Sequence, residues 1–168
     1  PAAPAPTLSQ AESFTSILDD DGGSRFSILS FGSALEGDVP GEEGVLSFQV
    51  TRDRATSSEA SVTVTLRPDP FAPSDSQLGP DAEDIGEITV VSQDGTRSVV
   101  GVGFDGSSRS FTLDFAAGET VKTIEVQTTP DLFVEADEWL SAVLSNPTAT
   151  DPAAPAPTLS QAESFTSI

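Results

Sequence analysis

Hydrophobic and polar residues alternate along most of this chain. In residues 60–66, for example, Val62, Val64 and Leu66 alternate with serine and threonine. A period of two places successive side chains on opposite faces of a strand, so that one face is buried and the other is exposed. Polar turns separate such segments and no helical period interrupts them, which predicts an all-β fold, an antiparallel seven-stranded immunoglobulin-like β-sandwich. The predicted strands cover residues 24–31, 45–51, 60–66, 111–115, 122–127, 139–145 and about 157–168.

Two further β-branched runs lie between the third and fourth predicted strands. They occupy residues 87–91 and 98–102 and are separated by Asp94-Gly95. Asp-Gly between such runs is a strong signal for a β-hairpin. We therefore predict an inserted β-ribbon over about residues 86–104. Because it interrupts a connection and not a strand, we expect the sandwich to fold without it.

The two ends of the chain carry the same sequence. Residues 1–17 recur identically as residues 152–168. A repeat of this length indicates a tandem array of similar modules, of which this chain holds one period and the start of the next. Residues 1–21 are then the last strand and acidic linker of the preceding repeat, and residues 24–168 form one module.

The charge balance narrows the class of partner. The chain has 27 acidic and 7 basic residues and a formal net charge of −20, which disfavours binding to nucleic acid or to an anionic membrane surface. It has no cysteine and no histidine, so it lacks disulfides and the commonest general base and transition-metal ligand. No apolar run reaches the length of about 18 residues that a membrane-spanning helix needs, and we expect no membrane insertion.

Acidic residues cluster just before the sixth predicted strand, where residues 131–138 hold four carboxylates. Such a cluster repels itself unless solvent or a cation compensates it. In an antiparallel fold every second connection lies at the same end, so this cluster shares an end with acids near Glu36 and Asp84. The last strand also ends there, and if the repeat continued it would be followed by three aspartates like those at residues 19–21. Glu119 falls at the opposite end and is predicted to be structural. Hard oxygen ligands in loops suit calcium, and we predict a calcium site at the acidic end.

Several separated motifs resemble the Calx-β domain family. Residues 34–38, Ala-Leu-Glu-Gly-Asp, resemble its Ser-x-Glu-Gly step, and residues 115–124 are similar to its Phe-x-x-Gly-Glu-x-x-Lys-x-Ile segment. The acidic loop of residues 131–138 runs into an apolar strand that closes on Leu-Ser-Asn-Pro at residues 144–147, as in the family. The resemblance covers about residues 26–168.

This resemblance implies a calcium-binding module with carboxylate ligands in its loops. The residues that match the calcium-binding positions of the family are Glu36, Asp84, Asp131, Glu135 and Glu138. The acids of the repeat junction complete the predicted site, and they are Asp19, Asp20 and Asp21.

The resemblance and the repeat together predict a structural calcium-binding repeat of a long extracellular adhesin or cell-surface filament, stiffened by calcium at the module junctions. Its partners would be neighbouring copies of the same repeat, arranged head to tail. Two alternatives stay open: a calcium-sensing regulatory domain, and a ligand-binding module that uses the inserted ribbon. Catalysis, for example glycoside hydrolysis by two carboxylates, is disfavoured because histidine and cysteine are absent and the candidate acids lie at module ends.

The duplicated ends suggest one more interaction. Residues 1–17 have the sequence of the module's own last strand, but in this chain they precede a module that already has one. An extended segment of this kind seeks a sheet edge. We therefore expect that residues 1–17 of one molecule can replace residues 152–168 of a neighbour.

Overall fold

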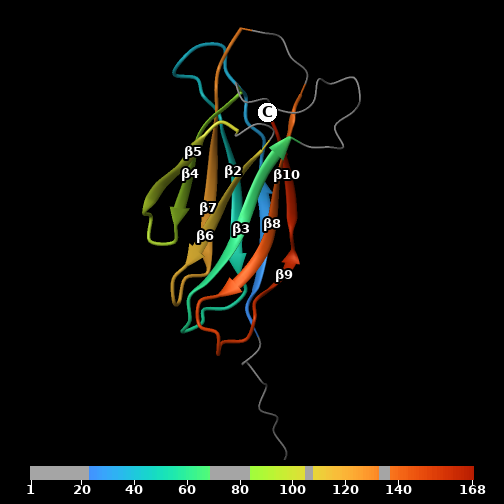
Figure 1. Ribbon diagram of the computed structural model, residues 1–168. Coiled ribbons are helices and arrows are strands. Elements are labelled where there is room, and N and C mark those ends of the chain that lie inside the picture. Colours follow the sequence, from blue (N-terminus) through green and yellow to red (C-terminus); the bar gives the residue numbers. More distant parts are fainter. Residues whose placement is uncertain (1–22, 69–83, 105–107, 133–136) are drawn as a thin grey trace, which may run out of the picture.

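Ten β-strands in two sheets make up the described part of the protein (Figure 1). The computed structural model describes residues 23–68, 84–104, 108–132 and 137–168. The strands, in chain order, are β1 (Arg25–Phe31), β2 (Val45–Arg52), β3 (Ala60–Pro68), β4 (Ile85–Ser92), β5 (Arg97–Val102), β6 (Arg109–Phe115), β7 (Val121–Thr128), β8 (Trp139–Ala149), β9 (Thr158–Gln161) and β10 (Glu163–Ser167). Within these ranges no helix is present that could cross a membrane.

The two sheets differ in size. The larger sheet has the strand order β5-β4-β7-β2-β1-β9, and the smaller has the order β10-β8-β3-β6. All neighbouring pairs are antiparallel except β1 and β9, which run parallel. This arrangement confirms the predicted all-β sandwich.

The core lies between the sheets and is built from the alternation seen in the sequence. Strands β2, β3 and β7 bury every second residue. Phe26 of β1 and Phe115 of β6 come from different sheets, and their ring centroids lie 5.2 Å apart with an interplanar angle of 54°. Each such buried side chain stabilises the fold by about 1.5–3 kcal/mol relative to exposure, so the interdigitated rows hold the two sheets together.

The predicted seventh strand is divided between the two sheets. Its first part, β9, pairs with β1 in the larger sheet, and its second part, β10, pairs with β8 in the smaller one. Ala162 separates them, and its carbonyl accepts a hydrogen bond from the Leu144 amide. This division and the two ribbon strands account for the difference between seven predicted strands and ten observed ones.

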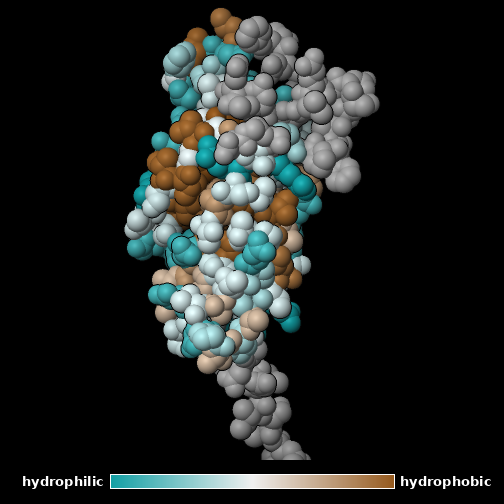
Figure 2. Space-filling model, viewed as in Figure 1, coloured by the Kyte–Doolittle hydropathy of each residue, from teal (hydrophilic) through white to brown (hydrophobic). Residues whose placement is uncertain are grey.

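The predicted ribbon forms, but it is part of the main sheet. Strand β4 lies between β5 and β7, and its Ile85, Ile88 and Val90 belong to the hydrophobic core. This placement argues against our expectation that the sandwich folds without residues 86–104, because removing β4 would expose that core. Of the two ribbon strands only β5 is an edge strand; its Val99 and Val102 are exposed, and a hydrophobic patch lies on that side of the molecule among polar residues (Figure 2).

The two opposite ends of the sandwich are formed by different connections between strands. We call the end with the β1–β2 connection, Asp84, the β7–β8 connection and Ile168 the acidic end, and the end with the β2–β3, β4–β5, β6–β7 and β8–β9 connections the base end (Figure 1). Strand β1 begins at the base end, whereas β10 ends at the acidic end. Residues 1–22 lie outside the described residues, so the module boundary between residues 21 and 24 stays a prediction.

Candidate metal centre

Thr128, the last residue of β7, organises the acidic end. It is 1% exposed, and its hydroxyl oxygen accepts a hydrogen bond of 2.6 Å from the Gly44 amide. The hydroxyl can donate to the Glu36 carbonyl at 3.1 Å, while the Thr128 amide donates to the Gly44 carbonyl at 2.9 Å. The connection that carries Glu36 is therefore fixed to the end of β7 by main-chain and side-chain bonds.

Two glycines allow the β1–β2 connection to fold back on itself. Gly37 has φ +91°, and a Cβ atom there would lie 2.5 Å from the Glu42 carbonyl oxygen. A Cβ atom on Gly44 would lie 2.1 Å from the Leu35 carbonyl oxygen. Both positions require glycine. Glu36 is flanked in the sequence by Leu35 and Gly37, which take part in these two close approaches. Its Oε1 atom is buried.

Asp84 lies beside the same strand end. Its carbonyl oxygen accepts a 2.8 Å hydrogen bond from the Thr129 amide, and the next residue, Ile85, pairs with Thr128. Asp84 is 7% exposed. Burial of a carboxylate is costly unless hydrogen bonds or an opposite charge compensate it, and Asp84 does interact with neighbouring groups.

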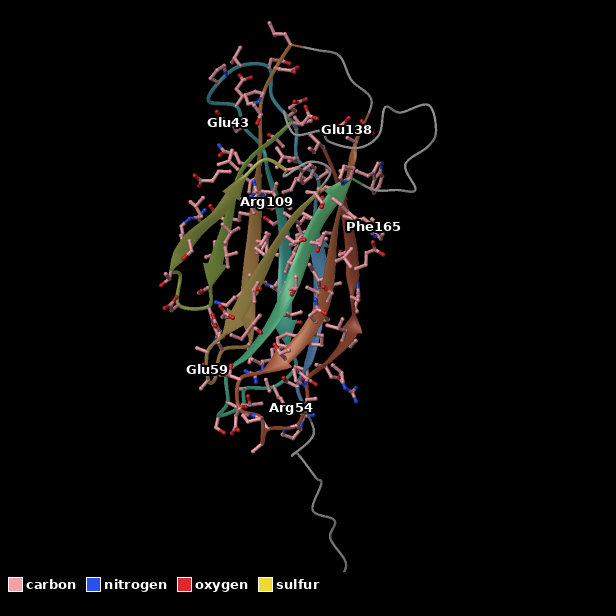
Figure 3. The ribbon with its side chains drawn as sticks, in the orientation of Figure 1. Glu43, Arg54, Glu59, Arg109, Glu138 and Phe165 are labelled. Atoms are coloured by element: carbon pink, nitrogen blue, oxygen red, sulfur yellow. The ribbon has the colours of Figure 1, made fainter. Side chains whose placement is uncertain are left out.

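Asp131 and Glu138 stand at the two sides of the β7–β8 connection. Glu138 directly precedes β8, and its backbone exchanges two hydrogen bonds with Ile168, of 3.3 and 3.0 Å. The end of the last strand therefore lies beside this acid. Figure 3 shows Glu138 and Glu43 at the acidic end and Arg54 and Glu59 at the base end.

Additional negative charge lies on the β1–β2 connection. Glu43 accepts a 3.0 Å hydrogen bond from the Gly41 amide, and this bond lowers the pKa of the Glu43 carboxyl from its ordinary value. Glu42 accepts a weaker bond of 3.4 Å from the Asp38 amide. Residues 32–44 contain no basic residue, so nothing on this connection itself neutralises its carboxylates.

The described residues fit calcium in donor chemistry but do not complete a site. Four of the predicted ligands, Glu36, Asp84, Asp131 and Glu138, lie in segments at one end of the sandwich, and all four interact with neighbouring groups. Carboxylate oxygens on loops are the donors that calcium prefers. Among the residues that the structure describes, however, no three acids are close enough together to hold a metal ion. The remaining predicted ligands lie outside the described residues, and they are Glu135, Asp19, Asp20 and Asp21.

Sequence reasoning missed the role of Thr128. Alternation along β7 predicts an inward side chain at this position, and a polar residue buried at a strand end needs hydrogen-bond partners. Its partners are main-chain groups of a connection more than 80 residues earlier in the chain, as in the Gly44 bond. No local sequence pattern identifies such a partner.

The base end holds two buried cations. Arg52 is 3% exposed; its Nε donates to the Ser24 hydroxyl at 3.0 Å, and its Nη2 donates to the Ser58 carbonyl at 3.0 Å and to the Thr56 hydroxyl. Burial lowers the pKa of Arg52, which the nearby Asp53 partly offsets. Guanidinium pKa values are high enough that Arg52 stays charged.

Lys122 is the second buried cation of the base end. Its Nζ atom lies 2.9 Å from Glu119 Oε1 and donates to the Ser92 hydroxyl at 2.7 Å. Glu119 also accepts a 3.0 Å bond from the Ala116 amide. Glu119 therefore lies at the end opposite the predicted calcium ligands and has the structural contacts that were predicted for it.

Comparison with known proteins gives a family and several distant structural likenesses. A model described as Calx-beta domain matches residues 77–167, more than half of the chain. No curated protein matches.

Three solved structures illustrate the structural likenesses. A type I cohesin–dockerin complex from Clostridium thermocellum is 12% identical with a TM-score of 0.48, over 94% of this chain and 97% of that chain. An apo-form Calx CBD1 domain is 17% identical with a TM-score of 0.39, over 83% of this chain and 96% of that chain. The B domain of a biofilm-associated protein is 7% identical with a TM-score of 0.42, over 89% of this chain and 44% of that chain. At these identities and TM-scores, the likenesses carry no argument about function.

Proposed function

This chain belongs to the Calx-β domain family, and on that premise we propose that it is a calcium-binding structural repeat of a long extracellular adhesin or surface filament. One observation carries the proposal. The hydrogen bonds of Thr128 and Thr129 bring the segments of Glu36 and Asp84 to the start of the acidic β7–β8 connection. Carboxylates from three separate parts of the chain thus lie at one end of the sandwich.

Calcium at this end would offset repulsion between the acids and cross-link their connections. It takes six to eight oxygen ligands in flexible geometry. The residues that we expect to supply them are Glu36, Asp84, Asp131, Glu135 and Glu138, with an acid triplet like Asp19, Asp20 and Asp21 arriving from the junction. Without calcium, the uncompensated charges would loosen this end.

The direction of the strands favours a head-to-tail array. The last strand ends at the acidic end and β1 begins at the base end, so the acidic end of one repeat faces the base end of the next. The connecting residues 18–24 can span at most about 25 Å. Calcium bound at the acidic end would then fix the joint between repeats.

The alternatives receive unequal support. A calcium sensor needs few copies, whereas an identical 17-residue repeat indicates an array. A ligand-binding role for the ribbon is the second candidate, because Val99 and Val102 on the β5 edge are 59% and 64% exposed. We propose no catalytic role.

A chain of two consecutive repeats tests the proposed function. Small-angle X-ray scattering in calcium should show a longer maximum dimension and a narrower range of shapes than scattering in chelator. Magnesium at the same concentration controls for general ionic screening, and Glu138→Gln in the first repeat should reduce the response. Equal scattering curves with calcium and with chelator would refute a calcium-stiffened joint.

A further inference from the structure

The last strand occupies the seam between the two sheets. Strand β9 is the edge of the larger sheet beside β1, and β10 is the edge of the smaller sheet beside β8. We call the space between β1 and β8 that these strands fill the seam slot. Because both strands are edges, they can leave the slot without separating any other pair of strands.

Hydroxyl groups fix the last strand in the seam slot. The Ser160 hydroxyl donates to the Phe26 carbonyl at 3.2 Å, and the Ser164 hydroxyl oxygen accepts a 2.8 Å bond from the Ser30 amide. The Thr166 hydroxyl donates to the Gly32 carbonyl at 2.7 Å. Ser164 and Thr166 are 8% and 2% exposed. The slot therefore recognises a specific order of hydroxyl side chains as well as a β-strand.

The chain contains a second copy of this recognised sequence. Residues 1–17 are identical to residues 152–168, so Ser9, Ser13 and Thr15 stand where the last strand has its three hydroxyl groups. Every contact of the seam slot is chemically available to them. We propose that the seam slot is an interaction site that accepts residues 1–17 of a second copy of this chain.

The geometry excludes exchange within one molecule. The Ser24 carbonyl accepts a hydrogen bond from the Thr158 amide, so Ser24 lies at the base end of the slot, and Ile168 lies at its acidic end. These positions are about 30 Å apart, because the chain takes ten residue steps of about 3.3 Å each from Thr158 to Ile168, with a break at Ala162. If residues 1–17 filled the slot, residues 18–24 would have to span that distance, but they reach at most about 25 Å. The donor segment must therefore come from another molecule.

This contact joins different surfaces of the two molecules. The donor uses its N-terminal segment and the acceptor uses its seam slot, so the interaction is heterologous and builds open head-to-tail chains. Residues 18–24 of the donor then lead from the acidic end of the acceptor to the base end of the donor. The inference does not depend on the proposed calcium function, since it rests on sequence identity and on the slot alone.

The protein's own last strand competes with the donor. Because it is tethered, its effective concentration is in the millimolar range, so exchange in the unmodified chain is expected to be minor. Thr166→Asp weakens the own strand selectively: it places a carboxylate, which cannot donate, against the Gly32 carbonyl in a buried position. Thr15→Asp is the matched change in the donor segment, and it leaves the slot and the own strand unaltered.

Sedimentation velocity of four proteins decides between exchange and its absence. With Thr166→Asp alone, the average mass should at least about double as concentration rises, because every molecule has a vacated slot and an intact donor. The unmodified chain and Thr15→Asp should stay mainly monomeric, and the double variant should not assemble. Assembly of the double variant to the same extent as Thr166→Asp would overturn the proposal, as would a folded Thr166→Asp protein that remains monomeric.

A peptide supplies a test that does not depend on the folding of the variant. A fluorescent peptide of residues 1–17, at several millimolar to match the tethered strand, is heated and cooled with the unmodified chain. We expect it to be retained after gel filtration, and the same peptide with Thr15→Asp to be lost. Equal retention or equal loss of the two peptides would contradict recognition by the seam slot.

Discussion

The two ends of the sandwich bury charge in different ways. At the base end, hydroxyl groups, a carbonyl and the Glu119 carboxylate contact the cations of Arg52 and Lys122, and of the Arg52 nitrogens only Nη1 is buried without a hydrogen-bond partner. At the acidic end, hydrogen bonds hold the main chain of the Glu36 and Asp84 segments in place, while the acids outnumber the bases around them. The base end should thus be stable without added ions, whereas the acidic end should depend on them.

The largest expected effect comes from removing the buried guanidinium of the base end. Arg52→Ala leaves the Ser24 and Thr56 hydroxyl groups without their donor and creates a cavity, which should lower the free energy of unfolding by about 2–4 kcal/mol. The loss should be the same with calcium and with chelator. Urea unfolding followed by circular dichroism measures it.

Arg54→Ala is the matched control for this change. The side chain of Arg54 is 38% exposed, and its Nε atom lies 3.7 Å from the Asp53 carboxylate. Exposed pairs of this kind contribute about 0–1 kcal/mol. A loss at Arg52 no larger than that at Arg54, or one that calcium restores, would contradict the self-contained base end.

A smaller effect is expected at Thr128. Thr128→Val keeps the shape of the side chain but deprives the Gly44 amide of its acceptor, which should cost about 1–3 kcal/mol in the free energy of unfolding. It should also reduce the stabilisation by calcium, because the Glu36 connection is no longer held at the end of β7. Calorimetry with and without calcium gives both quantities.

The control for Thr128 is Thr65→Val, which removes an exposed hydroxyl that is hydrogen-bonded to Ser110 at 2.8 Å. We expect a change within about 0.5 kcal/mol, as for most surface substitutions. If Thr128→Val left the calcium response intact, the connection of Glu36 would not belong to the site.

The smallest expected effects are on the stability of the fold at acid pH. One carboxyl group at each end, Glu43 and Asp94, contributes to them. Hydrogen bonds from backbone amides lower the pKa of Glu43, mainly through Gly41, and that of Asp94, mainly through Thr96. A carboxyl with a lowered pKa stabilises the fold above its unfolded pKa of about 4, and this contribution is lost as the pH falls through the lower, folded pKa. Glu43→Gln and Asp94→Asn should therefore each make the melting temperature less dependent on pH below about pH 4.

The two carboxyl variants also sharpen the comparison of the ends. At neutral pH the response to calcium should be unchanged by Asp94→Asn at the base end. Glu43→Gln should weaken it slightly, because it removes a negative charge from the acidic end. A larger loss from Asp94→Asn than from Glu43→Gln would contradict the assignment of calcium to the acidic end.

The sequence predicts the strands well because their signal is local. Alternation in β3, from Val62 to Leu66, follows directly from burial of one face, and Asp94-Gly95 specifies a hairpin. The position of β4 inside the sheet could not be predicted, because its pairing with β7 depends on residues at least 30 positions away. The division of the last strand at Ala162 depends likewise on which sheet edges are open.

The candidate site was predictable only in its location. Antiparallel topology correctly places the segments of Glu36, Asp84 and Glu138 at one end, because it needs only the number of strands between them. It does not specify distances between carboxylates. These distances depend on connections whose conformation is set by special contacts, such as the close approach of Gly44 to Leu35.

Differential scanning calorimetry with calcium and then with chelator tests the central claim most directly. The protein for this measurement is the chain continued past Ile168 through the Leu-Asp-Asp-Asp that follows residue 17 in the repeat. With an affinity of about 10⁻⁴–10⁻³ M, calcium at about 10 mM should stabilise the folded state by about 1.4–2.7 kcal/mol, or roughly 3–10 °C in melting temperature. Glu135→Gln with Glu138→Gln should abolish most of this shift. An unchanged melting temperature in millimolar calcium would contradict the account.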